Sequence, residues 1–382
     1  MLIPRFAPSY TISDIFHSII QCFQKEDNSP KINNLFKNSY CAYFSNARSG
    51  IYFLLSILPP GEVILPGYIC KVVPPAIIKS GHKPIFVDIA VNELNVPINN
   101  IYKSFTKNTR ALIAPHLYGL PCDLVELQNF CSENNIILLE DAAAAFGASY
   151  QGQPIGKFGD AAVFSFGKGK PLSAGRGGLL VINNHELMDK VDAATKDLLP
   201  QSIFVSLGIA LFQKIVSYQQ IYQWAYLFQK TIEGGNFWED GSLSKVDRNF
   251  SLFMMDKFNF RLMMSQIKRW PDIITGRQKI AKAYKEMIQN PLVRHFKIPE
   301  NSKPAWSSFP FLIDRRKDFF QYMHKNNIDL SWSFNYNIAE YYGNFNCKNA
   351  SNVAGKILSL PTQPHLSNWE INHIITKVNG FK

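Results

Sequence analysis

From residue 47 to about residue 182, short apolar runs bounded by Gly or Pro alternate with longer stretches of helical period. This alternation is typical of βα units that build a mostly parallel sheet. In such sheets ligands gather beyond the carboxyl ends of the strands, so the residues that follow each strand are candidate site residues. Six apolar runs are predicted strands, over 63–65, 84–87, 111–114, 136–139, 162–164 and 178–181. Three stretches are predicted helices, over 48–58, 72–79 and 124–134.

The pattern changes after residue 185, where a mainly helical stretch extends to about residue 230. A Gly-containing polar segment over 233–244 is predicted to be a loop, and a long helix is expected over 261–288. The segment LSLPTQP is expected to be extended. The last region is predicted to contain a strand, a helix and a final helix, over 308–313, 316–325 and 366–378.

Length and composition agree with a globular protein of two domains. The chain has 382 residues, of which 46% are hydrophobic and 18% charged, so disordered and fibrous proteins are excluded. We expect an α/β fold. A large domain over 1–275 holds a mostly parallel sheet flanked by helices, and a smaller α+β domain spans 276–382.

The charge balance is basic, with 40 Lys and Arg against 29 Asp and Glu, a net charge of +11. Such an excess suits an anionic partner. The basic residues occur in pairs and triples such as Lys268-Arg269, without a long basic run, so we expect no nucleic-acid partner. The six cysteines form no CxxC pair, so we expect no metal site and reduced thiols in the cytoplasm. The N-terminus lacks the pattern of a secretory signal.

The segment over about 202–230 is rich in apolar and aromatic residues. Up to residue 229 its one charged residue is Lys214, but five glutamines interrupt it, so we do not expect a transmembrane helix. We interpret it as helices buried in a dimer interface or a domain core. Contact with a membrane surface is the less favoured alternative.

Three segments combine residues that carry chemistry. The first segment, ILLEDAAAAFG, places two acids at a strand end, and the second of them is Asp141. The second segment, FSFGKGKPLSAGRGG, places Lys168 and Lys170 in a glycine-rich turn. The third segment, residues 46–49, begins a helix. Each has an ordinary structural explanation: an acidic helix cap, a basic loop, a capped helix start. Together, these three segments predict a pyridoxal phosphate site. The helix start would bind the phosphate, the carboxylate would contact the ring nitrogen, and the lysine would form the Schiff base.

Read in order, these motifs and others resemble the DegT/DnrJ/EryC1/StrS family of pyridoxal-phosphate-dependent sugar aminotransferases, which have fold type I. The resemblance covers nearly the whole chain. It includes the motifs NARSGIYFLL, PPGEVILPGYIC, GHKPIFVDI, TRALIAPHLYGLPCDL, ILLEDAAAAFGASYQGQPIGKFGDAAVFSFGKGKPLSAGRGG, RQKIAKAY and LSLPTQPHLS.

The resemblance implies roles for individual residues. Lys170, six residues after Phe164, matches the lysine that forms the Schiff base with the cofactor, whereas Lys168 does not. Asp141 matches the aspartate on the pyridine nitrogen, where a negative charge keeps the ring protonated. The remaining matches lie in the phosphate-binding positions, at Ala47, Arg48, Ser49 and Ser165.

The chain departs from the family pattern at several positions. Ala144 stands where the family has a glutamine that contacts the ring hydroxyl, and Cys70 stands where an aromatic residue often stacks on the ring. Tyr68 is a candidate substitute for that aromatic residue. Arg176 replaces an acidic or small residue. We interpret His116 as a loop histidine with a hydrogen-bonded ring, although it matches a family position near the active-site entrance.

The resemblance implies an aminotransferase that moves an amino group, with glutamate the expected donor, to a nucleotide-linked keto sugar in polysaccharide or secondary-metabolite biosynthesis. It also implies a homodimer. A family dehydratase is a second enzyme candidate, but its members carry histidine in place of the lysine. The alternative from another class is a cofactor-binding regulatory or structural protein with little turnover, suggested by Ala144 and Arg176.

Overall fold

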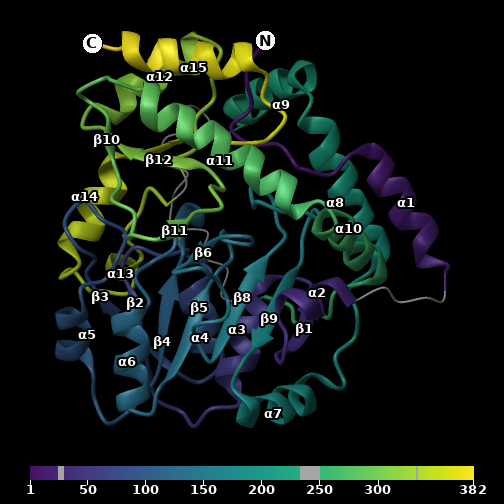
Figure 1. The fold of residues 1–382 in the computed structure, drawn as a ribbon, viewed down its shortest axis with the longest axis vertical. Helices are drawn as coiled ribbons and strands as arrows, with labels where there is room; N and C mark the ends of the chain where they lie inside the picture. Colours follow the sequence, from purple (N-terminus) through teal and green to yellow (C-terminus); the bar gives the residue numbers. More distant parts are fainter. Residues whose placement is uncertain (25–29, 233–249, 333) are drawn as a thin grey trace.

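A seven-stranded sheet forms the centre of the larger part of the chain (Figure 1). The structure is a computed structural model that describes residues 1–24, 30–232, 250–332 and 334–382, so the loop predicted over 233–244 lies outside the described residues. The strand order is β1-β9-β8-β5-β4-β2-β3. The strands are β1 Tyr40–Phe44, β2 Glu62–Pro66, β3 Lys83–Val87, β4 Thr109–Pro115, β5 Ile137–Asp141, β8 Ala161–Ser165 and β9 Gly178–Ile182.

All six predicted strands lie in this sheet, so the mostly parallel α/β prediction is confirmed. β9 is antiparallel to β8 and β1, while the neighbouring pairs from β8 to β3 are parallel. The prediction missed β1. This strand lies at the sheet edge and pairs Tyr40 with Ile182, a contact between segments that are far apart in the sequence.

Helices cover both faces of the sheet, because strands buried on both sides present apolar residues in both directions. In β8, Ala161 and Val163 join a core with α3, whereas Ala162 and Phe164 join a second core with α6. The predicted helices are therefore confirmed as the flanking layers. The helices in this part are α3 Ala47–Ser56, α4 Val73–Lys79, α5 Ile98–Ser104, the 3-10 turn η1 Leu117–Gly119, α6 Val125–Glu133 and α7 His185–Thr195.

A group of helices lies beside the sheet at the right of Figure 1. α1 begins with a capping box, in which the side chains of Thr11 and Asp14 each bond the other's backbone N–H. α8 and α9 form the predicted helical stretch, but only their inner faces are buried, through residues such as Ala210 and Tyr222. The group comprises α1 Ile12–Cys22, α2 Pro30–Leu35, α8 Ile203–Val216, α9 Gln219–Ile232 and α10 Lys257–Ile267.

The prediction of a single long helix over 261–288 is wrong. Two helices occupy the region, α10 and then α11 Trp270–Met287, separated at Lys268 and Arg269. Pro271 explains the break, because proline has no N–H and its ring clashes with the preceding turn in a helix interior. It is tolerated in the first turn of α11, where the structure places it.

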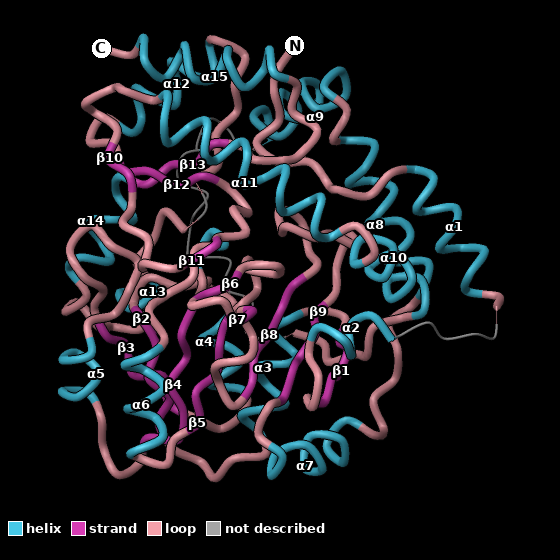
Figure 2. Tube along the Cα trace, in the orientation of Figure 1, coloured by secondary structure: helices cyan, strands magenta, loops and turns pink. Residues whose placement is uncertain are grey.

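The C-terminal part contains a second sheet of strand order β10-β12-β13 and the helices at the top of Figures 1 and 2. A third small sheet, β11-β6-β7, joins this part to a hairpin of the larger part. The remaining elements are β6 Ser149–Tyr150, β7 Gln153–Pro154, β10 Arg294–His295, β11 Ser302–Lys303, β12 Phe309–Leu312, α12 Arg316–Lys325, α13 Ile338–Tyr341, α14 Lys348–Lys356, β13 Ile357–Leu360 and α15 Asn368–Gly380.

We keep the division into 1–275 and 276–382 as a proposal, in which α11 spans the boundary. The first residues of the chain pack against the C-terminal part, although the division assigns them to the large domain. Ile3 forms a β-bridge with Ile328, and the Gln363 side chain donates to the Pro4 carbonyl at 2.8 Å. Figure 2 shows both chain ends at the top, on either side of α12 and α15. Among the described residues, no helix is both long and apolar enough to cross a membrane.

Candidate active site

A pocket of about 220 Å³ lies at the carboxyl edge of the central sheet. Parallel strands meet there, so residues from separate loops converge. Seven of the eight predicted site residues line the pocket, and the C-terminal part adds Phe334. The seven are Ala47, Arg48, Cys70, Asp141, Ala144, Ser165 and Lys170.

The start of α3 forms one wall, since Asn46, Ala47 and Arg48 all line the pocket. Ser49, the eighth predicted residue, does not. Its backbone N–H and its hydroxyl both donate to Asn46 Oδ1, at 3.0 and 3.2 Å, which makes Asn46 the N-cap. A Cβ on Gly178 would lie 2.4 Å from the Ala47 nitrogen, so only glycine allows the helix start to approach β9 this closely.

Arg48, one of the predicted phosphate-binding residues, lies in the first turn of α3. Its guanidinium lies 4.2 Å from the centre of the Phe250 ring, and Lys79 Nζ lies 4.7 Å from the same centre. Two cations on one ring place positive charge next to the α3 N-terminus, whose N–H groups already attract anions. This wall of the pocket therefore suits a phosphate.

Asp141 ends β5 and its carboxylate is buried. Oδ1 accepts the backbone N–H of Ala143 at 3.2 Å. Burial raises the pKa of Asp141 above its ordinary value, and the charge of Lys170 and the Ala143 N–H oppose that rise. A cationic partner inside the pocket would favour the ionised form.

Glu140, the other acid of the motif, has a structural role. Its Oε1 accepts the N–H groups of Phe158 and Gly159, both at 2.8 Å, and its Oε2 accepts that of Gly156 at 2.9 Å. His116 Nε2 lies 3.2 Å from the same Oε2. Both carboxylate oxygens of Glu140 therefore accept hydrogen bonds that hold the loop over 156–159 in place.

His116 lines the pocket with its ring hydrogen-bonded on both sides. Nδ1 accepts the N–H of Cys122 at 3.1 Å, and Nε2 faces Glu140. The interpretation as a histidine with a satisfied ring is thus confirmed. The backbone N–H at Nδ1 fixes which nitrogen accepts and holds the ring in place.

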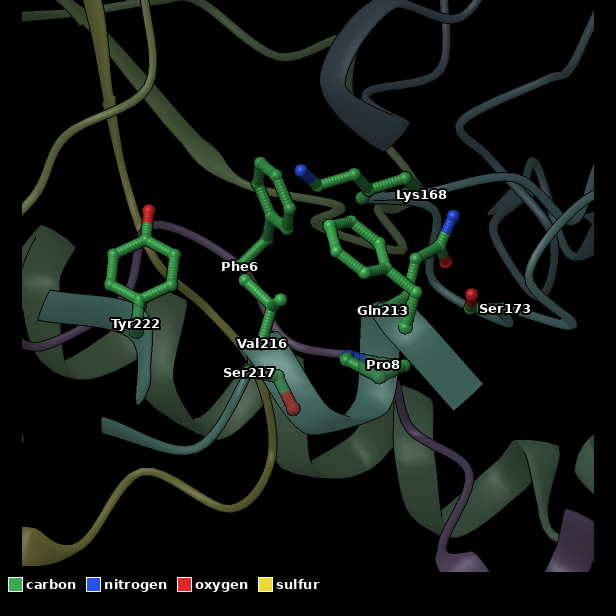
Figure 3. Close-up of a pocket in the computed structure, with 10 residues that line it drawn as sticks. Phe6, Pro8, Lys168, Ser173, Gln213, Val216, Ser217 and Tyr222 are labelled. Carbon is green, nitrogen blue, oxygen red and sulfur yellow. The ribbon is translucent and has the colours of Figure 1, made fainter. Parts of the chain in front are cut away.

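The two lysines of the glycine-rich turn enter different pockets. Lys170 lines the pocket with Asp141, whereas Lys168 lines a second pocket with Phe6 and Phe212 (Figure 3). Gly169, between them, has φ of 78°, a conformation that glycine adopts readily. Burial lowers the pKa of Lys168 to about 8, with a further lowering from the charge of Arg5.

The prediction that Tyr68 substitutes for the stacking aromatic residue is wrong. Tyr68 is fully buried outside the pocket lining, and its Oη lies 2.9 Å from Tyr118 Oη. Tyr118 and Phe334 line the pocket instead, with ring centres 5.6 Å apart in an edge-to-face arrangement. Cys70 also lines it, and burial raises the pKa of its thiol, so it stays protonated at neutral pH.

The two remaining departures from the family pattern behave differently. Ala144 lines the pocket and leaves that position without a side-chain donor. Arg176 is outside the pocket lining, and its Nε donates to the Ser45 carbonyl at 3.2 Å. Burial lowers the pKa of Arg176. This arginine supports the strand end before α3 and does not face the pocket.

Comparison with known proteins decides the family. The sequence model of the DegT/DnrJ/EryC1/StrS aminotransferase family matches residues 29–379, most of the chain. The chain belongs to this family. GDP-perosamine synthase of Escherichia coli O157:H7 is 25% identical over 99% of this chain and 98% of its own length. A dTDP-4-amino-4,6-dideoxy-D-glucose transaminase of Shigella dysenteriae is 24% identical over the same shares.

Solved structures show the same fold. Helicobacter pylori PseC, an aminotransferase in the biosynthesis of pseudoaminic acid, superimposes with a TM-score of 0.78 at 19% identity over 99% of this chain and 98% of its own. Spr1654 of Streptococcus pneumoniae, in its pyridoxamine phosphate form, has a TM-score of 0.77 at 18% identity, with the same coverage. These likenesses confirm fold type I.

Proposed function

We propose that this chain is a pyridoxal-phosphate-dependent aminotransferase that moves an amino group from glutamate to a keto sugar carried on a nucleotide. The observation that carries the proposal is that Lys170 and Asp141 line one pocket together with the start of α3. The relatives named above act on GDP- and dTDP-linked sugars. The net charge of +11 suits a diphosphate-linked substrate.

The residues present fit the cofactor. A phosphate requires N–H donors and positive charge, which the α3 start and Arg48 supply, and Gly178 lets the helix start lie against β9. A pyridine nitrogen requires a buried carboxylate, which Asp141 supplies. Ser165 also lines the pocket, and a serine hydroxyl suits a phosphate oxygen.

Pyridoxal phosphate supplies an aldehyde that condenses with amines and a ring that withdraws electrons from the attached carbon. Lys170 is the residue that would hold the cofactor through its amine, and its Nζ would also be the group that moves a proton at the substrate carbon. Asp141 would hold the pyridine nitrogen of the cofactor in its protonated form. The rings of Tyr118 and Phe334 add aromatic surface to the pocket lining.

A test of this function is amination of keto sugars on GDP or dTDP with ¹⁵N-glutamate as donor. The protein, loaded with pyridoxal phosphate, should produce an amino sugar nucleotide that carries the label, detected by mass spectrometry. Lys170→Ala is the inactive control. A matched control is Lys168→Ala, which changes the neighbouring lysine and leaves the pocket intact. Failure of the wild type with every keto sugar nucleotide offered would contradict the substrate class.

The proposal includes a homodimer and a cytoplasmic location. Enzymes of this fold commonly complete their sites with residues of a second subunit. All six cysteines lie within the described residues and are free thiols, as expected in a reducing compartment. A role in polysaccharide or secondary-metabolite sugar biosynthesis is supported by similarity to relatives such as the Bacillus subtilis spore coat polysaccharide biosynthesis protein SpsC.

A further inference from the structure

Arg277, in the middle of α11, is a buried cation that forms no ion pair with an acid of the described residues. Its Nη1 donates to the carbonyls of Trp306 and Ser307, at 3.3 and 3.2 Å. The same nitrogen donates to Thr362 Oγ1 at 3.1 Å, and that hydroxyl donates to the Trp306 carbonyl at 2.7 Å. The guanidinium therefore connects α11 with two loops of the C-terminal part.

Fold stability alone does not explain an arginine at this position. A buried charge without a counter-charge destabilises a fold unless hydrogen bonds compensate it, and an apolar side chain of similar volume avoids that cost. Burial lowers the pKa of Arg277 to about 10, so the guanidinium stays charged at neutral pH. Its Nε is buried without a hydrogen-bond partner among the described residues. The contribution of this arginine therefore lies in what its Nη1 holds in place.

The loop over 305–307, whose carbonyls Arg277 holds, forms backbone hydrogen bonds with a wall of the pocket at the carboxyl edge of the central sheet. The Ser307 N–H donates to the Tyr118 carbonyl at 2.9 Å. The Ala305 N–H donates to the Gly119 carbonyl at 2.9 Å. Because Tyr118 lines the pocket, these bonds connect the loop with the pocket wall.

Two residues of this junction have backbone conformations that bulky side chains rarely adopt. The φ angle is 58° at Tyr118 and 50° at Trp306. Gly119 has φ of 81°, and a Cβ at this position would lie 2.8 Å from the Trp306 nitrogen, so the two segments are packed closely. Such conformations persist only where the surrounding structure holds them. Arg277 supplies this restraint on the Trp306 side, and Ser307 transmits it to Tyr118.

We propose that Arg277 is a positioning residue for the pocket, because it holds Trp306 and Ser307 and through them fixes the backbone of Tyr118. Arg277 itself lies outside the pocket lining, so it acts through Tyr118 and not by contact with a ligand. The other end of the Tyr118 ring is held separately, with its hydroxyl 2.9 Å from the Tyr68 hydroxyl. The inference rests on the proposed use of this pocket for pyridoxal phosphate.

A double-mutant cycle on the full-length protein tests this proposal, with the dissociation constant of pyridoxal phosphate as the readout. The cofactor is removed and titrated back, and the absorbance band of the bound form is followed. Arg277→Gln and Tyr118→Ala should each raise the dissociation constant about tenfold. The double variant should exceed Tyr118→Ala by less than about twofold, because both substitutions disturb the same pocket wall.

The matched control is Tyr284→Phe, on the same helix. The buried Tyr284 hydroxyl donates to the Pro361 carbonyl at 3.0 Å, so its loss should lower the melting temperature. The dissociation constant of this variant should stay within about twofold of the wild type, because the hydroxyl does not contact the loop over 305–307. The control thus separates a general loss of stability from a loss of positioning.

The cycle also has a substitute for a variant that does not fold. If Arg277→Gln is misfolded in thermal unfolding, Thr362→Val takes its place, with an expected rise of about threefold that again disappears in the Tyr118→Ala background. An unchanged dissociation constant in a folded Arg277→Gln, or multiplicative effects in the double variant, overturns the inference and leaves the proposed function standing. Absence of cofactor binding by the wild type overturns both.

Discussion

The ammonium group of Lys168 lies 4.4 Å from the centre of the Phe6 ring, in a pocket separate from the one that Lys170 lines. The two lysines are separated by one glycine and differ completely in surroundings. Lys168 contacts Phe6 of the N-terminal segment and shares its pocket with residues of α8, whereas Lys170 shares its pocket with Asp141. The chemistry of the turn should therefore depend on Lys170 alone.

Borohydride reduction of the cofactor-loaded protein should fix the cofactor on Lys170. The peptide that carries the adduct is identified by mass spectrometry, and Lys168→Ala should retain it in full yield. Lys170→Ala should abolish it, because no other amine lines the pocket among the described residues. An adduct on Lys168 in the wild type would show that the lysines have been assigned in the wrong order.

At neutral pH and without cofactor, the wild-type protein should be less stable than the Asp141→Asn variant. Burial raises the pKa of Asp141, so the folded state binds the proton more tightly than the unfolded state does. The stabilisation from this proton is complete below the ordinary pKa of about 3.9 and is lost as the pH rises through the raised value. The melting temperature of Asp141→Asn should therefore exceed that of the wild type at pH 7, with the gap shrinking toward pH 4. The reverse order at pH 7 would mean that an unseen group stabilises the carboxylate.

Glu140→Ala should destabilise the fold, and it also removes the partner of His116 Nε2, a residue that lines the pocket. It removes the acceptor of three backbone N–H groups in the loop over 156–159. Each buried donor left unpaired costs about 1 kcal/mol or more, so urea unfolding should show a loss of about 3 kcal/mol. The exposed Glu126→Ala on α6 is the control and should stay within about 0.5 kcal/mol of the wild type. A similar small effect for Glu140→Ala would mean that water replaces the carboxylate.

Two copies of the chain should associate in solution. Light scattering at micromolar concentration should give twice the chain mass of 43.4 kDa. A mass of one chain across the concentration range would remove the homodimer from the proposal.

The sequence predicted the sheet well because its signal is local. Strands buried on both faces are short continuous apolar runs, and two of them, β5 and β8, end at the site residues Asp141 and Ser165. Seven of the eight predicted site residues therefore converge on one pocket. Ser49 is the exception, because it bonds its own N-cap, a detail that motif spacing does not contain.

Other parts of the site depend on contacts between distant segments. Phe334 reaches the pocket from the C-terminal part, and no local pattern marks it. Tyr118 reaches it through a backbone with φ of 58°, which is unusual for an aromatic residue and is not encoded in its neighbours. The break before α11 was predictable, since Pro271 is visible in the sequence and stops a helix. The exposed outer faces of α8 and α9 were not predictable, because an apolar helical pattern indicates that a face is buried but not what it packs against.

The half-reaction with glutamate tests the central claim most directly. Glutamate added to the cofactor-loaded protein should shift the absorbance to shorter wavelength as the pyridoxamine form accumulates. Asp141→Asn should slow this shift by about a hundredfold or more. Ala144→Gln should change it by about fivefold at most, because one hydrogen bond contributes about 1 kcal/mol net. If the cofactor attaches to Lys170 normally but neither glutamate nor any other amino acid produces the shift, the chain is not an aminotransferase and the regulatory alternative takes its place.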